Sequence, residues 1–482
     1  MMSKQKQQNI APNKFTFHGH GHPEPIGLEY IAGAVASSGF ICQFKGNWEL
    51  EVSLPDQQPK LILLSAITSD FHQILQAAHH ARERGNLTVL GGYHACGCYN
   101  DLIDSPFDYI VIGEGEEVVI AIAKARLLGV WDDLDSYEVK NVGLTKIVRA
   151  NRVEKLDSLP IPLRSEQRLS QYRIHDLMWP PPSLQQNPAL ILGSRGCVHN
   201  CDFCASSTVW GHGVRLRSPE NVVGELQDLQ TRFDTNTVVF IDQSLGQIKK
   251  WSIDLCNAIK NNVKGMHWYH QSNLTVDRDV IRAMAEAGCK KIGFGIEGVS
   301  PDAISRIKPV NPINYDTINE LCDFCNALGI FVKAYLIIGF PWETEDTVDE
   351  YLMWIQKLRV NQVKISYFTP FPGSRAWEQY SNQLVTTDWS DFDTVKMPVV
   401  RNPNISVERY HEIRNLLFKA FYGSPSYADV TSKILRLYPH YVQSYKEFTV
   451  FLQHFDMING DEIWLEWLNQ NQAGEIRLVA KH

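Results

Sequence analysis

The stretch Ser194-Arg-Gly-Cys197-Val-His-Asn-Cys201-Asp-Phe-Cys204 is the most informative part of this chain. Its three cysteines follow the spacing C-x₃-C-x₂-C, and no fourth cysteine follows in the same loop. Cysteine thiolates hold the irons of iron–sulfur clusters, and a loop of this length can place three thiolates around one face of a cubane. A cubane has four irons and this loop has three cysteines. One iron therefore has no protein ligand and keeps an open position for chemistry. The spacing predicts a catalytic 4Fe–4S cluster with Cys197, Cys201 and Cys204 as its metal ligands.

A structural zinc site or a set of buried thiols is the alternative to a cluster in this loop. Structural zinc takes four nitrogen or sulfur ligands, usually supplied by two paired groups. The nearest later cysteines, Cys256 and Cys289, are single and lie in apolar surroundings. The cluster is therefore the favoured interpretation.

The composition is that of an ordinary globular protein. The chain has 482 residues, of which 44% are apolar and 21% charged, and its formal net charge is −8. This length allows two or three domains, and the negative charge gives no attraction to nucleic acid or anionic membranes. No apolar run approaches the roughly 18 residues of a spanning helix, and the polar start lacks the core of a signal peptide. Cysteines without an export signal indicate a reducing compartment, so we expect a cytoplasmic protein with no nucleic-acid partner and no membrane insertion.

Four regions follow from the pattern along the chain. The first third alternates apolar runs, near residues 61–67, 87–90 and 109–112, with helical spacing, which is typical of a doubly wound, Rossmann-like parallel sheet. A proline-rich connector follows. The expected organisation is a Rossmann-like domain of residues 14–150, a linker of residues 151–188, a barrel of residues 189–385 and a helical C-terminal domain of residues 386–482.

The barrel region repeats a strand–helix pattern. A partial (β/α)₆ barrel of the TIM type, rather than the closed eight-stranded form, is expected from this repeat. Reactive groups in such barrels gather at the carboxyl ends of the strands. The expected strands lie near residues 189–193, 237–242, 267–273, 291–297, 331–338 and 363–369.

The cysteine loop resembles the signature of the radical S-adenosylmethionine (SAM) enzymes. This resemblance implies that the open iron chelates SAM, and that Asp242, at the end of the second strand, meets its amino group. It also implies that Glu297, in a G-x-E pattern, binds the ribose. The further SAM contacts that the resemblance implies are Phe203, Gly339 and Pro341.

Structural roles remain open for the two acids. Asp242 is also a candidate helix N-cap, and many members of the family carry a second acid where this chain has Gln243. A carboxylate such as that of Glu297 is costly at the end of an apolar strand unless it is paired, which favours a functional role.

The first third of the chain resembles the cobalamin-binding domain that precedes many radical SAM barrels. The resemblance rests on Pro25-Ile-Gly-Leu-Glu-Tyr-Ile-Ala-Gly-Ala34, Gly91-Gly-Tyr-His94-Ala and Tyr109-Ile-Val-Ile-Gly-Glu-Gly-Glu116. Glycine-ended loops suit cobalamin binding, because they let the backbone approach a flat corrin. A domain that has lost its cofactor is the alternative. The implied cobalamin contacts are Pro25, Gly27, Leu28, Ser65, Ala66, Gly91, Gly92, His94, Gly113, Glu114 and Gly115.

Two histidine patterns bear on the cobalt. Asp70-Phe-His72 lacks the glycine of the D-x-H-x-x-G motif that supplies a histidine beneath the cobalt, so the resemblance implies no such ligand here. The run His18-Gly-His20-Gly-His22 is either an accessory metal ligand or, as we favour, a surface loop.

The remaining cysteines and aromatic residues suit ordinary packing. Cys322 and Cys325 fall at helical spacing and are expected to be packed thiols. The aromatic C-terminal segment, with Trp464 and Trp467, is expected to form a helical cap over the barrel mouth, where its rings serve a substrate or a small core.

The resemblance implies a cobalamin-dependent radical SAM methyltransferase that acts on an unactivated carbon of a small-molecule or natural-product substrate. It implies that the cluster, reduced by an electron donor such as flavodoxin or ferredoxin, cleaves SAM to a radical that abstracts hydrogen, and that cobalamin carries the methyl group. Cyclisation, rearrangement or oxidation with the same cofactors is the second interpretation. A cobalamin- or metal-binding regulatory protein without catalysis is the third.

Overall fold

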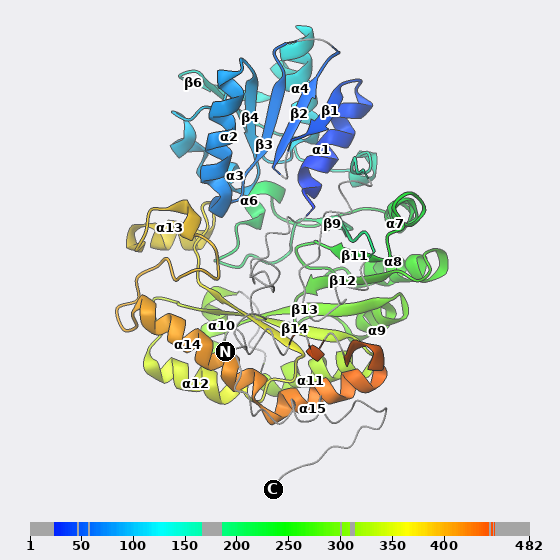
Figure 1. The fold of residues 1–482 in the computed structure, drawn as a ribbon, viewed down its shortest axis with the longest axis vertical. Helices are drawn as coiled ribbons and strands as arrows, with labels where there is room; N and C mark the ends of the chain where they lie inside the picture. Colours follow the sequence, from blue (N-terminus) through cyan, green and yellow to red (C-terminus); the bar gives the residue numbers. More distant parts are fainter. Residues whose placement is uncertain are drawn as a thin grey trace, which may run out of the picture.

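The computed structural model describes residues 24–45, 48–55, 58–165, 186–298, 301–308 and 314–442, together with residues 445, 446 and 448. These residues form two α/β units, with the N-terminal sheet standing beside one end of a second, parallel sheet (Figure 1). His18, His20, His22, Trp464, Trp467 and most of the expected linker lie outside the described residues.

The N-terminal unit is a seven-stranded sheet in the order β1-β2-β3-β4-β5-β7-β6. Its strands are β1 (Ile41–Phe44), β2 (Glu49–Ser53), β3 (Leu61–Ser65), β4 (Leu87–Gly91), β5 (Tyr109–Ile112), β6 (Glu138–Val142) and β7 (Thr145–Arg149). The neighbours from β3 to β7 in this order are parallel, whereas β1, β2 and β6 pair antiparallel at the edges.

Helices cover both faces of this sheet, as expected for a doubly wound domain. The helices are α1 (Ile26–Ser37), α2 (Phe71–Glu83), α3 (Tyr93–Cys98) and α4 (Gly115–Ala123). Alternate residues of one strand face opposite layers: Leu61 and Leu63 pack with α1 and α4, while Ile62 and Leu64 pack with α2 and α3. This alternation explains why the runs of buried residues in the central strands are continuous in sequence.

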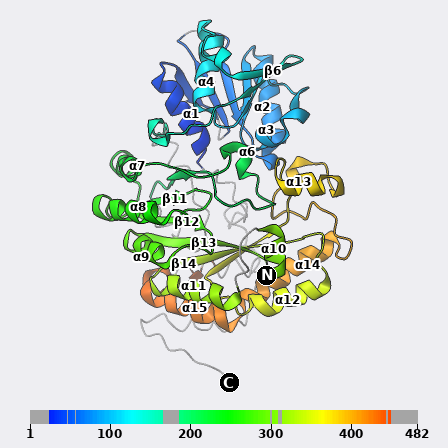
Figure 2. The same ribbon diagram turned by 180° about the vertical axis from the view of Figure 1, so that it is seen from behind.

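The second unit is a sheet of six parallel strands in the order β15-β14-β13-β12-β11-β8, which confirms the expected partial barrel. The strands are β8 (Ala189–Ile191), β11 (Thr237–Phe240), β12 (His267–Ser272), β13 (Cys289–Glu297), β14 (Phe331–Ile338) and β15 (Gln362–Tyr367). Its helices are α7 (Pro219–Phe233), α8 (Lys249–Asn262), α9 (Arg278–Glu286), α10 (Pro301–Ile307), α11 (Tyr315–Ala327) and α12 (Glu345–Ile355). Figures 1 and 2 show these helices along the outside of the strands.

Local signals set the boundaries of the barrel elements. Ser218 caps α7 by accepting a hydrogen bond from Asn221 N at 3.2 Å, and Pro219 occupies the first helical position. Asp277 caps α9 in the same way. Gly288, with φ +93°, ends the connection from α9 and turns the chain into β13.

The connection between β8 and α7 carries the cysteine loop. It contains the short strands β9 (Ser194–Arg195) and β10 (Arg215–Leu216), which pair antiparallel, and helix α6 (Ser206–Trp210). Helix α6 lies against α3 of the N-terminal unit.

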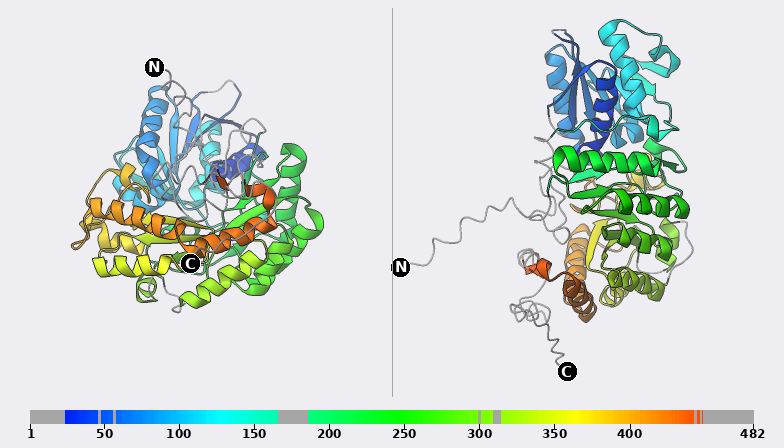
Figure 3. Two further views of the ribbon diagram at one scale, coloured as in Figure 1. Left: turned by 60° about the horizontal axis from the view of Figure 1, so that its bottom comes forward. Right: turned by 90° about the vertical axis from the view of Figure 1, so that its right-hand side faces the viewer.

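The C-terminal region is helical, but its described helices do not cover the barrel mouth. They are α14 (Val407–Tyr422) and α15 (Pro425–Leu437), whereas the short helix α13 (Arg375–Tyr380) comes before this region. Helix α14 packs on α12 and β15, and α15 packs on α11 (Figure 3). Aromatic side chains such as Phe418 and Tyr427 join the core between the sheet and its helices. The aromatic content therefore serves an additional outer layer.

None of the helices in the described ranges combines the length and the apolar character needed to cross a membrane.

Candidate active site

The three cysteines of the loop lie together beyond the carboxyl end of β8. Each is half-buried, and none forms a disulfide. Burial raises the pKa of the Cys201 thiol to about 12 and also raises that of Cys197, while the nearby Lys308 ammonium opposes both shifts. Cys204 acts electrostatically on both thiols, which places the trio at one site. In the described part of the chain, no three histidine, cysteine or acidic side chains converge on a position for one metal ion.

Two glutamines from the segment after β11 hold the backbone of this loop. Gln243 Oε1 accepts a hydrogen bond from Gly196 N at 3.0 Å, and Gln247 Oε1 accepts one from Val198 N at 3.0 Å. Gly196 has φ +91°, and a Cβ on it would lie 2.1 Å from the carbonyl oxygen of Gly213. Only glycine fits there. The sequence marked Gln243 only as a position where many members of the family carry an acid. Its role in the loop could not be predicted, because its partner Gly196 lies 47 residues away.

Asp242 fixes the chain where it enters the cysteine loop. Its carboxylate accepts hydrogen bonds from Gly193 N, at 3.0 Å, and from the Ser194 hydroxyl. It caps no helix, since the next helix begins at Lys249. Burial raises its pKa to about 6. The structure thus gives Asp242 a bracing contact between β11 and the β8–β9 connection.

Glu297 lies at the end of β13 in a backbone conformation that is rare for a residue with a side chain. Its φ is +68°, and the pairing register with β14 shifts beside it. Such conformations cost about 1–3 kcal/mol and cluster at functional sites. Glu297 Oε1 lies 3.3 Å from Lys308 Nζ, which also donates to Gly295 O at 2.8 Å. Burial raises the pKa of Glu297 and Lys308 lowers it.

The Glu297–Lys308 pair borders the cysteine loop. Lys308 acts electrostatically on both Cys197 and Cys201, and Glu297 acts on Cys201. A Cβ on Gly295 would lie 2.3 Å from Glu297 Oε1, which explains the glycine in the G-x-E pattern. The carboxylate that is expected to bind the ribose therefore lies beside the cysteine loop.

A buried acid supports the turn that follows β14. Gly339, with φ +91°, and Phe340 donate their backbone N–H groups to Glu343 Oε2 at 2.7 and 3.2 Å. Tyr410 OH and Tyr351 OH donate to the same carboxylate at 2.9 and 3.0 Å. Burial raises the pKa of Glu343 to about 7. Sequence reasoning missed Glu343, although it lies just after Gly339-Phe-Pro341.

Aromatic side chains join this turn to the cysteine loop. Phe340 stacks on Trp342 with ring centroids 4.8 Å apart, and Phe203 packs in the same apolar cluster as Phe340 and Phe368. Phe203 therefore lies near the Gly339–Pro341 turn. A cavity of about 320 Å³ opens there, lined by Asp202, Arg306, Ile307, Trp342, Phe368, Ala376, Gln379 and Tyr380.

The expected cobalamin residues divide into two groups. Ser65 and Gly91 are neighbours in register at the ends of β3 and β4, and Gly113 follows β5. A Cβ placed on Gly27 or Gly91 meets nothing within 4 Å, so the backbone is open there. The members of this first group, each at least partly exposed, are Pro25, Gly27, Ser65, Gly91, Gly92, Gly113 and Gly115.

The second group is buried and has other partners: Leu28, Ala66, His94 and Glu114. Leu28 and Ala66 belong to the cores on the two sides of the sheet. The fully buried His94 ring contacts Thr68 Oγ1 at 3.3 Å and Cys98 Sγ at 3.4 Å. Burial lowers the pKa of His94 to about 4. His94 thus serves the packing of α3.

Glu114 takes part in a buried ion-pair cluster that joins the two units. Arg195, just before the cysteine loop, lies 2.6 Å from Glu114 and 2.6 Å from Glu116. Arg215 pairs with Glu114 at 2.6 Å. The Arg195 guanidinium also lies 5.0 Å from the ring centroid of Trp210. Sequence reasoning missed Arg195, because its partners are about 80 residues away in another unit.

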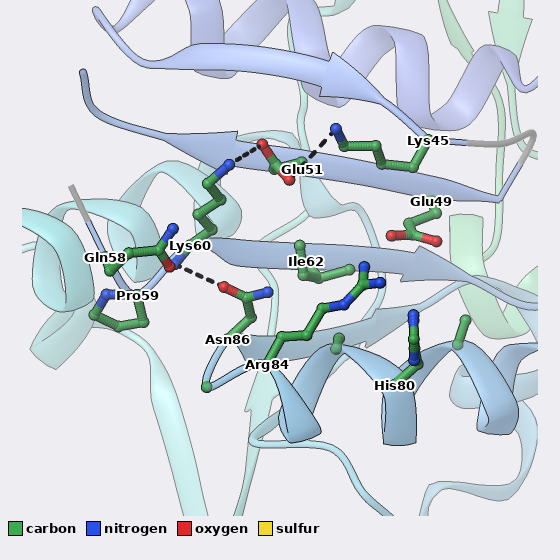
Figure 4. A pocket seen from close by; sticks show the side chains of 13 residues that line it. Lys45, Glu49, Glu51, Gln58, Pro59, Lys60, Ile62, His80, Arg84 and Asn86 are labelled. Carbon is green, nitrogen blue, oxygen red and sulfur yellow. Dashed lines mark hydrogen bonds and ion pairs between the residues drawn. The ribbon is translucent and has the colours of Figure 1, made fainter. Parts of the chain in front are cut away.

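A separate charged groove of about 830 Å³ lies on the N-terminal unit (Figure 4). Lys60 pairs with Glu51 at 2.8 Å, and Lys60 N donates to Asn86 Oδ1 at 3.2 Å. Lys60 and Asn86 precede β3 and β4, so this groove is at the amino end of the strands. The glycine-ended loops are at the opposite end, and the groove is not part of the candidate site.

Two family models match the chain. The model of the radical SAM superfamily matches residues 191–355. The model of the B12 binding domain matches residues 16–123.

Two curated relatives are similar in sequence, and a solved structure is similar in fold. The chain is 28% identical over 433 residues to an uncharacterized methyltransferase of Pyrococcus horikoshii, covering 83% of this chain and 88% of that protein. It is 24% identical over 463 residues to the hopanoid C-3 methylase of Methylococcus capsulatus, covering 92% and 85%. The structure of TsrM from Kitasatospora setae, a radical SAM methyltransferase with cobalamin and a 4Fe–4S cluster bound, matches with a TM-score of 0.64 and 14% identity, covering 90% and 97%.

The fold and the site define an iron–sulfur enzyme with a cofactor-binding domain beside its barrel. The chain carries a B12 binding domain ahead of a radical SAM domain. These two domains imply a 4Fe–4S cluster, SAM and cobalamin as its cofactors.

Proposed function

We propose that this protein is a cobalamin-dependent radical SAM methyltransferase that transfers a methyl group to an unactivated carbon of a small-molecule substrate. The observation that carries this proposal is that three free thiols lie in one loop next to the Glu297–Lys308 pair, beside a domain whose glycine-ended loops face the barrel. When bound, the cluster supplies the electron that cleaves SAM, and cobalamin supplies the methyl group.

The chain holds the cluster through three sulfur atoms. Cys197, Cys201 and Cys204 are the ligands in this proposal, and the raised pKa values of Cys197 and Cys201 mean that metal binding displaces thiol protons. Lys308 offsets part of the negative charge that the thiolates bring into the site. An external electron donor, such as flavodoxin or ferredoxin, completes the system.

The cysteine loop and the ends of β13 and β14 would hold SAM in this proposal. The Glu297 carboxylate would accept hydrogen bonds from the ribose hydroxyls. Phe203 and the Gly339–Pro341 turn border the adenine, and Glu343 keeps that turn in place through the two backbone N–H groups that it binds. The bracing contact of Asp242 supports the same site without touching SAM.

The glycine-ended loops of the N-terminal sheet would hold cobalamin. Pro25, Gly27, Ser65, Gly91, Gly92, Gly113 and Gly115 are its proposed contacts. The open backbone at Gly27 and Gly91 fits a large flat ligand. His94 and Glu114 are left out of this set because both are buried against other partners.

The cluster assignment is tested by replacing each loop cysteine with alanine. After anaerobic reconstitution, each variant should lose most of its iron and all reductive SAM cleavage, measured as 5′-deoxyadenosine. Cys256→Ala is the matched control, because Cys256 is a buried packing thiol on α8. Iron content and SAM cleavage like those of the wild type in any loop variant would overturn the assignment.

Methyl transfer is tested on the wild-type enzyme. A corrinoid spectrum should survive gel filtration, and metabolite comparison of a deletion strain should show a product that is heavier by one methylene than its precursor. A product of unchanged carbon count would replace methyl transfer with cyclisation or oxidation.

A further inference from the structure

The inner face of the barrel sheet is apolar at one edge and mostly polar at the other. On the β8–β11 side the inward positions are apolar, with Leu190, Val239 and Ile241. On the β12–β15 side the residues that alternate with the outward core positions are mostly polar: Tyr269, Gln271, Lys291, Lys333, Tyr335, Lys364 and Ser366. Barrel interiors are normally filled by branched apolar side chains, and lysine is rarely buried unless it is paired.

The strand register places Lys364 in a layer that borders the candidate active site. Gly295, Tyr335 and Lys364 are neighbours in register and form one layer of the sheet. Glu297 is two residues further along β13, but the register shift beside it places it opposite Leu336, only one residue beyond Tyr335. Glu297 Oε1 and Lys308 Nζ would lie 2.3 and 3.1 Å from a Cβ on Gly295, so the Glu297–Lys308 pair borders the layer that contains Lys364.

Two of the inward side chains, Gln271 and Tyr335, form a hydrogen bond with each other. The Tyr335 ring leans over Gly293, since a Cβ there would lie 2.5 Å from the ring, and Gln271 donates to Tyr335 OH at 3.3 Å. Both contacts pull Tyr335 toward β13 and β12, away from β15. Lys291, deeper in the barrel, donates to Gln362 at 2.7 Å.

Lys364 differs from these residues because its ammonium has no acceptor. Among the described residues it makes no hydrogen bond and no ion pair, although it is only partly exposed. Burial and the positive charges of Lys333 and Arg414 lower its pKa to about 8, and the carboxylate of Asp393 opposes this shift. Arg414 itself is engaged with the carbonyl oxygens of Ile365 and Val395. A largely buried cation without an acceptor costs free energy unless a ligand supplies one.

We propose that the barrel interior binds the anionic group of the substrate, a carboxylate or a phosphate, with Lys364 as its donor and Lys333 as the second positive charge. This inference deepens the proposed function and rests on it, because it names the class of molecule on which the enzyme acts. An anion at this layer holds the substrate inside the barrel, in the layer that the Glu297–Lys308 pair borders.

The test measures anion binding to the reconstituted holoenzyme. Calorimetric titrations use inorganic phosphate and acetate as probes, with chloride keeping the ionic strength constant, on wild type and on Lys364→Met. We expect at least one probe to bind the wild type and to bind Lys364→Met at least tenfold more weakly. Binding of phosphate alone identifies a phosphorylated substrate, and binding of acetate alone identifies a carboxylate.

Two further variants control the result. Lys364→Arg keeps the positive charge and should retain binding, which separates the charge from any effect of the substitution on packing. Lys250→Met removes an exposed lysine of α8 and should bind the probes as the wild type does. Equal binding by wild type and Lys364→Met, or no binding of either probe by wild type, would overturn the proposal. The titration needs neither SAM nor a reductant, so it can fail while SAM cleavage by the wild type succeeds.

Discussion

Replacing Arg195 with methionine should destabilise the protein far more than the loss of an ordinary surface charge. The Arg195 side chain is buried and lies 2.6 Å from each of two buried carboxylates, Glu114 and Glu116. Glu114 keeps its pair with Arg215, but Glu116 loses its guanidinium partner. Removing one partner of a buried ion pair costs about 3–5 kcal/mol, because the remaining charge stays desolvated. We expect a loss of that size in the free energy of unfolding.

The measurement is equilibrium urea unfolding of wild type, Arg195→Met and a matched control. Arg232→Met is the control, since Arg232 forms an exposed pair with Asp228 at 3.0 Å on α7, and exposed pairs contribute about 0–1 kcal/mol. The double variant Arg195→Met with Glu116→Gln should recover part of the loss, because it removes the charge left unpaired. A loss in Arg195→Met no larger than that in Arg232→Met would refute the idea that this cluster holds the two units together.

Two further predictions concern acids of the candidate site. Burial raises the pKa of Glu343 to about 7 from an ordinary value near 4.5, so the folded state binds the extra proton between these values and stability falls as pH rises through that window. Glu343→Gln should remove a slope of at most about 1.4 kcal/mol per pH unit there; identical pH profiles of unfolding would contradict this. Glu297→Gln should weaken SAM binding by about 30-fold, the equivalent of about 2 kcal/mol for hydrogen bonds to a charged acceptor, with unchanged iron content. Glu286→Gln, an exposed acid on α9, is the control in the same titration, and unchanged SAM affinity in Glu297→Gln would exclude the ribose contact.

The central strands of both sheets were predictable, because their residues are mostly buried and the apolar runs end in small residues or glycine. Leu61–Ser65 and Phe331–Ile338 are examples. The antiparallel edge strands were not predicted, since β1 and β6 are short and partly exposed and so carry little apolar signal. The cysteine spacing likewise pointed to the site from the sequence alone.

The supporting residues of the site could not be predicted in the same way. Arg195 and Gln243 act through partners that are distant in the sequence, and no local pattern marks such pairs. Glu114 sits in a glycine-rich motif that suggests a ligand contact, yet its carboxylate faces arginines of the barrel unit. The position of α14 depends on which apolar surface the sheet edge leaves uncovered, and helical spacing alone does not specify that surface.

The contact between Gly97 and Pro372 has a consequence for how the two cofactors are spaced. A Cβ on Gly97 would lie 2.3 Å from the carbonyl oxygen of Pro372, so α3 touches the segment that follows β15 backbone to backbone. Together with the arginine–glutamate cluster, this contact means that the two units cannot slide or hinge without breaking contacts. The spacing between the glycine-ended loops and the cysteine loop is thereby set by the folded chain, and a substitution at the junction should disturb the residues that would hold both cofactors.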